Sequence, residues 1–128
     1  MIARGPTLLL VDDDADLRDL IALHLVRSGW RVYPAASGEE AIELACREPP
    51  DVILLDCRMC GMDGLTTLRE LRARPQTVAV PVVLMTAGLD PCELDAARMA
   101  GCAGVIAKPF DGRALATELR RLVPELEG

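Results

Sequence analysis

The stretch Leu8-Leu9-Leu10-Val11-Asp12-Asp13-Asp14 joins an unbroken apolar run to three consecutive acidic residues. An apolar run without alternating polar residues is typical of a strand that is buried on both faces, as in a parallel sheet. Four further short runs follow along the chain: Arg31–Tyr33, Val52–Leu55, Val82–Met85 and Val105–Ala107. We therefore predict five strands of one parallel sheet, the first of which leads directly into the acidic residues.

Helical patterns follow each of these runs. Ser37 with Glu40 predicts a capping box at the start of the second helix, and Asp63 predicts the N-cap of the third. The fourth helical segment, Pro91–Ala100, is rich in alanine, and Met99 is one of its few large apolar residues. Strand and helix alternate five times, which predicts an open parallel sheet with helices on both faces. One domain, residues 1–128 with a core over about 6–123, is expected to fill the chain.

The composition narrows the range of functions. A formal net charge of −6 argues against direct nucleic-acid binding by this segment, because phosphate backbones would repel it. The longest apolar stretches have four residues, whereas a span of the bilayer needs roughly 20. No N-terminal signal sequence is visible, so we expect a cytoplasmic protein with no membrane segment. The five cysteines are an odd number and are expected to be reduced thiols.

Polar side chains follow four of the five predicted strands: Asp12-Asp13, Asp56, Thr86 and Lys108. In open α/β sheets, sites form outside the carboxyl ends of the strands, and a parallel sheet brings those ends to one edge. We therefore expect these side chains to converge, although almost the whole chain separates the first from the last. Asp14 and Asp16 are expected instead to cap the first helix and to occupy its first turn.

A cluster of this composition favours a bound cation. Two carboxylates about 4 Å apart repel each other by roughly 4 kcal/mol at an effective dielectric constant near 20. Lys108 offsets only part of the charge of Asp12, Asp13 and Asp56. Hard oxygen ligands with room for water match Mg²⁺, with Mn²⁺ as the alternative ion. A divalent cation beside a lysine spreads the charge of a transferring phosphoryl group, while the protein supplies position.

Five short pieces of the chain carry a family resemblance. They are Leu10-Val11-Asp12-Asp13, Leu54-Leu55-Asp56, Met59-Cys60-Gly61-Met62-Asp63-Gly64, Met85-Thr86-Ala87 and Lys108-Pro109-Phe110. Together and in this order they resemble the response-regulator receiver domain of two-component signalling, over essentially the whole chain. The resemblance implies a flavodoxin-like (CheY-like) α/β fold, with a five-stranded parallel sheet of strand order 2-1-3-4-5 and five helices on both faces.

The resemblance also implies roles for the residues at the strand ends. Asp56 would accept a phosphoryl group from a sensor histidine kinase or a histidine phosphotransfer protein. Asp12, Asp13, Asp56 and the backbone carbonyl of Arg58 would hold the metal ion, and Lys108 would pair with the phosphoryl oxygens. The domain would then be a phosphoacceptor regulator that takes part in its own phosphotransfer and autodephosphorylation, not an enzyme with a separate substrate.

The switching part of the resemblance involves a second group of residues. The Thr86 hydroxyl would turn inward to a phosphoryl oxygen and move the loop at Ala87, and the Lys108-Pro109 peptide would be cis. Output would then pass through the face formed by the fourth helix, fifth strand and fifth helix, to another copy of the domain, a kinase or an effector domain. Family members commonly carry Tyr or Phe three residues before the lysine as a rotating switch. Here that position is Val105, so coupling by burial of a ring is unavailable.

Two further departures fall in the loop after the acceptor. The usual proline of this loop is replaced by Cys60, which frees one φ angle and restores an N–H. Arg58 places a long cation beside Asp56, where we expect it to contact the phosphoryl group or to shield it from water. Either contact would change the lifetime of the phosphorylated state.

The spacing Cys57-Arg58-Met59-Cys60 offers redox or metal chemistry as an alternative. Redox C-x-x-C pairs usually open a helix, whose N-terminus lowers a thiol pKa. Here the pair lies in a predicted loop, with the helix beginning near Asp63. A zinc site would need two further ligands, and the other cysteines show no paired spacing.

A phosphatase or phosphotransferase with an aspartyl nucleophile after the first strand is the other alternative. Asp12 and Asp14 loosely fit that pattern, but Asp56 would then have no role and the chain has no cap domain to hold a substrate.

His24 is the only histidine. It is predicted to lie along the apolar stripe of the first helix, facing away from the strand ends, which argues against histidine-based catalysis.

Overall fold

The computed structural model describes residues 5–88, 90–108 and 111–127. Strands and helices alternate in the order β1 (Thr7–Val11), α1 (Ala15–Arg27), β2 (Arg31–Ala35), α2 (Gly38–Arg47), β3 (Val52–Asp56), α3 (Gly64–Arg72), β4 (Val82–Thr86), α4 (Pro91–Met99), β5 (Gly104–Ala107) and α5 (Leu115–Leu122). Short 3-10 helices lie at Gly112–Ala114 and Pro124–Glu127. The strands pair in parallel in the order β2-β1-β3-β4-β5, which confirms the predicted topology.

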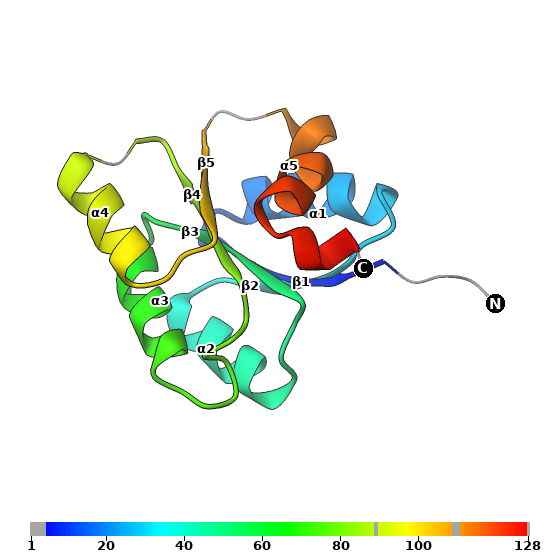
Figure 1. Cartoon of the computed structure of the whole chain (residues 1–128). Helices are drawn as coiled ribbons and strands as arrows, with labels where there is room; N and C mark the ends of the chain where they lie inside the picture. Colours follow the sequence, from blue (N-terminus) through cyan, green and yellow to red (C-terminus); the bar gives the residue numbers. More distant parts are fainter. Residues whose placement is uncertain (1–4, 89, 109–110, 128) are drawn as a thin grey trace.

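Two layers of helices cover the sheet (Figure 1). α1 and α5 pack on one face, and α2, α3 and α4 lie on the other. Successive residues of a strand point to opposite faces, so Leu8 packs toward α1 and α5 whereas Leu9 packs toward α2 and α3. The central strands β1, β3 and β4 are buried on both faces, as predicted, while the edge strands β2 and β5 are partly exposed.

The helix starts follow the predicted caps with one correction. Asp14 and Asp63 cap α1 and α3 by accepting backbone N–H bonds. At α2, Ser37 Oγ accepts from Glu40 N at 3.1 Å, but the Glu40 carboxylate accepts from Ala36 N, one residue beyond the expected donor. The predicted capping box is therefore only half formed. A complete box occurs at α4, between Asp90 and Glu93.

α4 is held to the sheet by little apolar surface. Ala97 is its one fully buried residue, and Met99, one of its few large apolar residues, is 89% exposed. The helix ends at Met99, and Gly101 adopts a φ of 88° that an alanine would rarely tolerate. Within the described ranges, no helix is both long enough and apolar enough to cross a membrane.

The register of the sheet positions the strand ends that carry polar residues. Val11 pairs with Leu55, and Asp56 pairs with Met85. Beyond the strands, Lys108 N donates to Thr86 O at 2.7 Å. Side chains that are distant in the sequence are thereby brought to one edge of the sheet.

Candidate functional site

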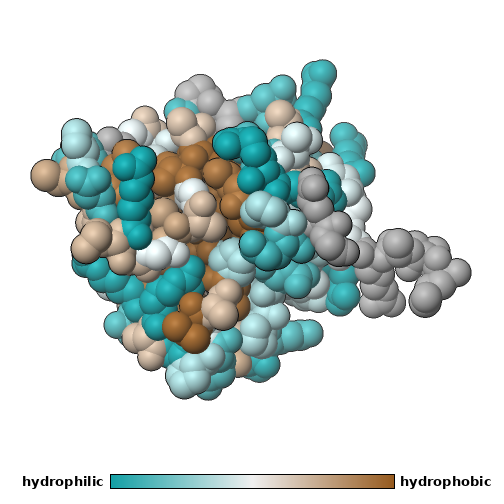
Figure 2. Space-filling view, viewed as in Figure 1, coloured by the Kyte–Doolittle hydropathy of each residue, from teal (hydrophilic) through white to brown (hydrophobic). Residues whose placement is uncertain are grey.

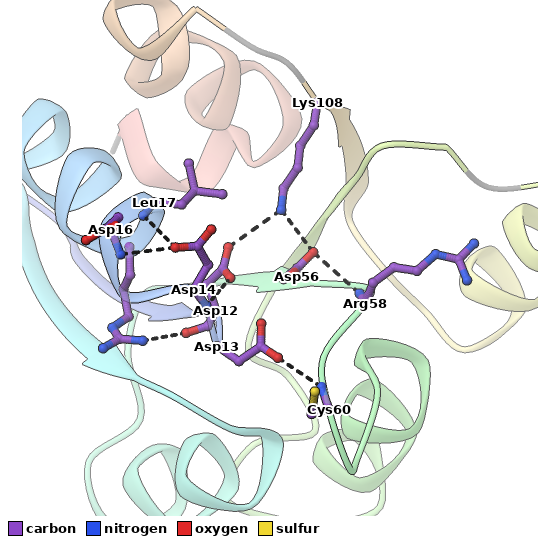
Figure 3. A network of polar contacts seen from close by, with 10 residues as sticks. Asp12, Asp13, Asp14, Asp16, Leu17, Asp56, Arg58, Cys60 and Lys108 are labelled. Carbon is purple, nitrogen blue, oxygen red and sulfur yellow. Dashed lines mark hydrogen bonds and ion pairs between the residues drawn. The ribbon is translucent and has the colours of Figure 1, made fainter.

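Three carboxylates meet at the carboxyl edge of the sheet (Figure 3). Asp12 and Asp13 follow β1 and Asp56 ends β3, and one oxygen from each lies within 4.8 Å of the others. Asp12 is 1% exposed and Asp56 is 5% exposed, whereas Asp13 is exposed. The predicted acidic cluster is therefore present, with two of its members removed from solvent.

Each carboxylate accepts one backbone N–H through a single oxygen. The three bonds run from Asp14 N to Asp12 Oδ1 (2.9 Å), from Cys60 N to Asp13 Oδ2 (2.9 Å) and from Arg58 N to Asp56 Oδ1 (3.4 Å). Within the described ranges the second oxygen of each carboxylate accepts no hydrogen bond, and Asp12 Oδ2 is also buried. Three oxygens are thus left to meet a ligand.

Lys108 supplies the positive charge of this cluster. Its Nζ lies 3.2 Å from Asp56 Oδ1 and 3.6 Å from Asp12 Oδ2, and its side chain is 22% exposed. Three carboxylates against one ammonium leave two negative charges uncompensated. Burial raises the pKa of the Asp12 carboxyl above its ordinary value, and the nearby Asp56 charge adds to that rise, against the lowering effect of the Asp14 N–H.

An oxygen-only ligand set with excess negative charge fits a hard divalent cation. The buried Asp12 Oδ2 is the observation that tests this fit: it has a long ion-pair contact with Lys108 but accepts no hydrogen bond, and a buried carboxylate oxygen without a hydrogen bond is costly. Mg²⁺ binds through one or two carboxylates and keeps several waters, which suits a cluster with one exposed member. The Arg58 carbonyl as a further ligand stays a prediction.

Thr86 lies at the end of β4 and is 3% exposed. Its Oγ1 accepts a hydrogen bond from Gly88 N at 3.0 Å, so the hydroxyl is engaged with its own loop. The expected turn of this hydroxyl toward a phosphoryl oxygen stays a prediction. Val105 is half-buried and packs against the hydrophobic core between the sheet and helices α2, α3 and α4, whereas Ala87 is exposed.

The Arg58 guanidinium does not lie over Asp56. Its Nη2 is 3.4 Å from Gly88 O and 3.4 Å from Glu93 Oε1, so the guanidinium extends toward the start of α4 (Figure 3). The expected contact with a phosphoryl group, or its shielding from water, stays a prediction. The carbonyl of Gly88 and the carboxylate of Glu93, which attract the guanidinium, lie 30 and 35 positions further along the chain.

Two residues outside the predicted site support the backbone around it. A Cβ at Gly64 would lie 2.6 Å from Asp56 O, so α3 can begin this close to β3 only with glycine. Arg18 Nη1 donates to Asp12 O at 2.6 Å and holds the backbone of the β1–α1 turn. The position of Gly64 directly after the predicted N-cap Asp63 is a sequence signal for its role. Nothing in the sequence points to the contact of Arg18.

The remaining predictions concern the cysteines, His24 and the Lys108-Pro109 peptide. All five cysteines lie among the described residues and have free thiols, as expected.

His24 is half-buried but does not face away from the strand ends, because it lines the same shallow apolar hollow as Lys108. Its ring packs against Gly112, which draws this side of α1 toward the segment after β5. Pro109, and with it the expected cis peptide, lies outside the described residues.

Comparison with known sequences supports the geometry. The sequence model of one protein family, the response regulator receiver domain, matches residues 8–120 of this chain. The transcriptional regulatory protein AfsQ1 of Streptomyces coelicolor is 36% identical over 118 residues, which cover 92% of this chain and 51% of the relative. The phosphate regulon transcriptional regulatory protein PhoB of Pseudomonas aeruginosa is 31% identical over 119 residues, which cover 93% and 52%. The chain thus spans about half the length of the curated relatives it matches.

Solved structures with the same architecture include two informative neighbours. The chemotaxis protein CheY4 of Vibrio cholerae matches with a TM-score of 0.88 and 29% identity, covering 94% of this chain and 100% of that one. The receiver domain of a sensor histidine kinase from Pseudomonas aeruginosa matches with a TM-score of 0.84 and 33% identity, covering 94% and 98%. That structure has a magnesium ion coordinated in the active site cleft.

Proposed function

Because the chain belongs to the response regulator receiver domain family of two-component systems, we propose that Asp56 is its phosphoacceptor. The donor is a phosphohistidine of a sensor histidine kinase or of a histidine phosphotransfer protein. One observation carries the proposal: the Asp56 carboxylate ends β3, 3.2 Å from the Lys108 ammonium and within the cluster of three acids. A nucleophile, a counter-charge and a cation site therefore share one pocket.

The chemistry follows from these groups. An Asp56 carboxylate oxygen forms a bond to phosphorus while the bond from phosphorus to the donor imidazole nitrogen breaks and its electron pair stays on the nitrogen. The product is an acyl phosphate, and water later hydrolyses it to inorganic phosphate and free Asp56. Lys108 would stabilise the charge that the phosphoryl oxygens bring to the pocket. On this view the domain acts on itself and has no separate substrate.

Asp12, Asp13 and Asp56 would hold Mg²⁺, or Mn²⁺ in its place, with the Arg58 carbonyl completing the protein's share of ligands. When bound, the ion neutralises charge on the transferring phosphoryl group and on the acidic cluster. The carboxylates themselves orient the site, because each is already held by a backbone N–H. A bound ion would also satisfy Asp12 Oδ2, which is buried and accepts no hydrogen bond.

Phosphorylation would be transmitted through the β4–α4 loop. If Thr86 Oγ1 exchanges its bond from Gly88 N for a phosphoryl oxygen, the loop that begins α4 loses one of its attachments. α4 has little buried surface to resist a shift. Figure 2 shows apolar side chains gathered over β5, between α4 and α5, and this is the face that we propose for output. A second copy of the domain or an output domain in a longer protein is the partner we propose for it.

The wider setting is proposed on the same basis. The net charge of −6 makes this segment a poor ligand for nucleic acid, so any such binding would belong to another part of the protein. We place the domain in the cytoplasm, where its phosphodonors act.

Incubation with acetyl phosphate and Mg²⁺, followed by intact-mass measurement, tests the proposal. Wild type should gain one phosphoryl group, and Asp56→Asn should gain none. Chelation of Mg²⁺ should abolish the gain in wild type. If Asp56→Asn were modified as fast as wild type, the acceptor assignment would be wrong.

A further inference from the structure

The three backbone donors of the acidic cluster differ in origin. Asp14 N and Arg58 N each bind the aspartate two residues before them, inside the same turn. Cys60 N instead binds Asp13 Oδ2 at 2.9 Å, across 47 residues of sequence. This bond joins the β3–α3 loop to the β1–α1 turn, as Figure 3 shows.

We propose that the backbone N–H of Cys60 positions the Asp13 carboxylate for a divalent cation, so that Cys60 is a positioning residue of the metal site through its main chain and not its thiol. This inference rests on the proposed function, because it presumes that the acidic cluster binds Mg²⁺. It adds a residue that the family resemblance does not supply, since the usual proline at this position has no N–H to donate.

Asp13 needs such a donor more than its neighbours do. Asp12 and Asp56 are buried, and both lie within 3.6 Å of Lys108 Nζ. Asp13 is exposed, and within the described ranges the bond from Cys60 is the one hydrogen bond to its carboxylate. An exposed aspartate without that bond would exchange between rotamers, and a metal ion would have to order it on binding. The Cys60 N–H makes that ordering part of the fold.

The bond engages one Asp13 oxygen and leaves the other open. Oδ2 accepts the Cys60 N–H, and within the described ranges Oδ1 accepts no hydrogen bond. A neutral N–H withdraws a little charge from the carboxylate and so opposes metal binding. Outer hydrogen bonds to metal ligands nevertheless strengthen binding as a rule, because the gain in orientation exceeds this loss. We therefore expect the bond to tighten binding.

Magnesium affinity measured by calorimetry in two variants tests the inference. Cys60→Pro removes the donor, and Cys60→Ala keeps it while removing the thiol. Cys60→Pro should bind Mg²⁺ about threefold to tenfold more weakly than wild type, near the lower end of the losses known for outer-shell changes. Cys60→Ala should restore wild-type affinity. Equal affinity in wild type and Cys60→Pro would overturn the proposal, and so would an equal loss in both variants.

Two further measurements keep the test decisive if proline disturbs the loop. An α-hydroxy acid at position 60 replaces the N–H by oxygen with little change of backbone shape, and it should weaken Mg²⁺ binding to a similar extent. In the metal-free protein, Asp13→Ala should speed hydrogen exchange at the Cys60 amide several-fold, while Asp12→Ala should not. Unchanged affinity with the hydroxy acid, or unchanged exchange in Asp13→Ala, would refute the positioning role. Failure of wild type to bind Mg²⁺ would instead refute the proposed function.

Discussion

Lys108 Nζ lies 3.2 Å from Asp56 Oδ1, although 52 residues separate the two in the sequence. The ammonium reaches the acceptor from the end of β5, across the end of β4, and it also lies 3.6 Å from Asp12 Oδ2. One cation therefore partly neutralises two buried carboxylates.

Removal of the ammonium should make the metal-free pocket less stable and less reactive. In Lys108→Ala, Asp12 and Asp56 lose their counter-charge, so we expect a lower free energy of unfolding by about 1–2 kcal/mol, below the figure for fully buried pairs because Lys108 is partly exposed. Phosphorylation by acetyl phosphate should slow at least about tenfold. Chemical denaturation and intact-mass kinetics measure the two effects. Wild-type values for both would contradict this role of Lys108.

Magnesium should stabilise the fold by relieving the buried charge of Asp12. The folded-state pKa of Asp12 is raised above its ordinary value of 3.8, so the folded protein holds this proton more tightly than the unfolded chain does. The Asp12 contribution to metal-free stability should therefore fall as pH rises from about 3.8 through the raised pKa, and stay low above it.

Thermal unfolding at neutral pH, with and without Mg²⁺, checks this prediction. Mg²⁺ should raise the midpoint in wild type. Asp12→Asn should raise the metal-free midpoint and remove most of the Mg²⁺ effect. Asp19→Asn is the matched control, because Asp19 is an exposed acid of α1 outside the cluster. A control that behaved like Asp12→Asn would point to a general effect of net charge.

Arg58 and Glu93 should be coupled, and their contact should restrain α4. The pair is exposed and 3.4 Å apart, so a double-mutant cycle of Arg58→Ala and Glu93→Ala should give a coupling energy of about 0.2–1 kcal/mol. Amide exchange in the first turn of α4 should be faster in Arg58→Ala, with Mg²⁺ affinity unchanged. The rate of dephosphorylation should change in the same variant. A rate equal to that of wild type would remove the link between Arg58 and the phosphorylated state.

Gly64→Ala should displace the acceptor strand. The new Cβ would meet Asp56 O at 2.6 Å and Cys57 Cα at 2.7 Å, and backbone atoms cannot move away as a side chain can. We expect a loss of about 1–3 kcal/mol of stability and slower phosphorylation. Gly88→Ala is the control, since a Cβ there would meet no atom within 4 Å. Equal effects in the two variants would show that the close approach at Gly64 is unimportant.

Cys60 should react with alkylating reagents much faster than Cys57. Burial, with the Asp56 charge adding to it, raises the pKa of the Cys57 thiol to about 11, so little thiolate is present near neutral pH. Cys60 is exposed in the same loop. Peptide mapping after a brief exposure to iodoacetamide measures both rates. Comparable rates, or ready formation of a Cys57–Cys60 disulfide, would revive the redox interpretation of this loop.

The sequence by itself determined the fold and the residue types of the site. Unbroken apolar runs such as Leu8–Val11 specify central strands, because only a strand covered on both faces can bury every side chain. Alternating helices then restrict the topology, and parallel strands bring their polar ends to one edge. For this reason the sequence alone predicts that Asp12, Asp13, Asp56 and Lys108 converge.

The tertiary structure alone decided which partner each of these groups has. The sequence places Arg58 next to Asp56, and the structure shows that its guanidinium extends toward Glu93 and the start of α4. From the sequence, the replacement of proline by Cys60 indicates only that a backbone N–H is available. The fold places the Asp13 carboxylate where it accepts a hydrogen bond from this N–H. Hydrogen bonds and ion pairs act over a few ångströms, whereas sequence patterns specify only which face or edge a residue occupies. The details of contact therefore depend on where distant elements come to rest against one another.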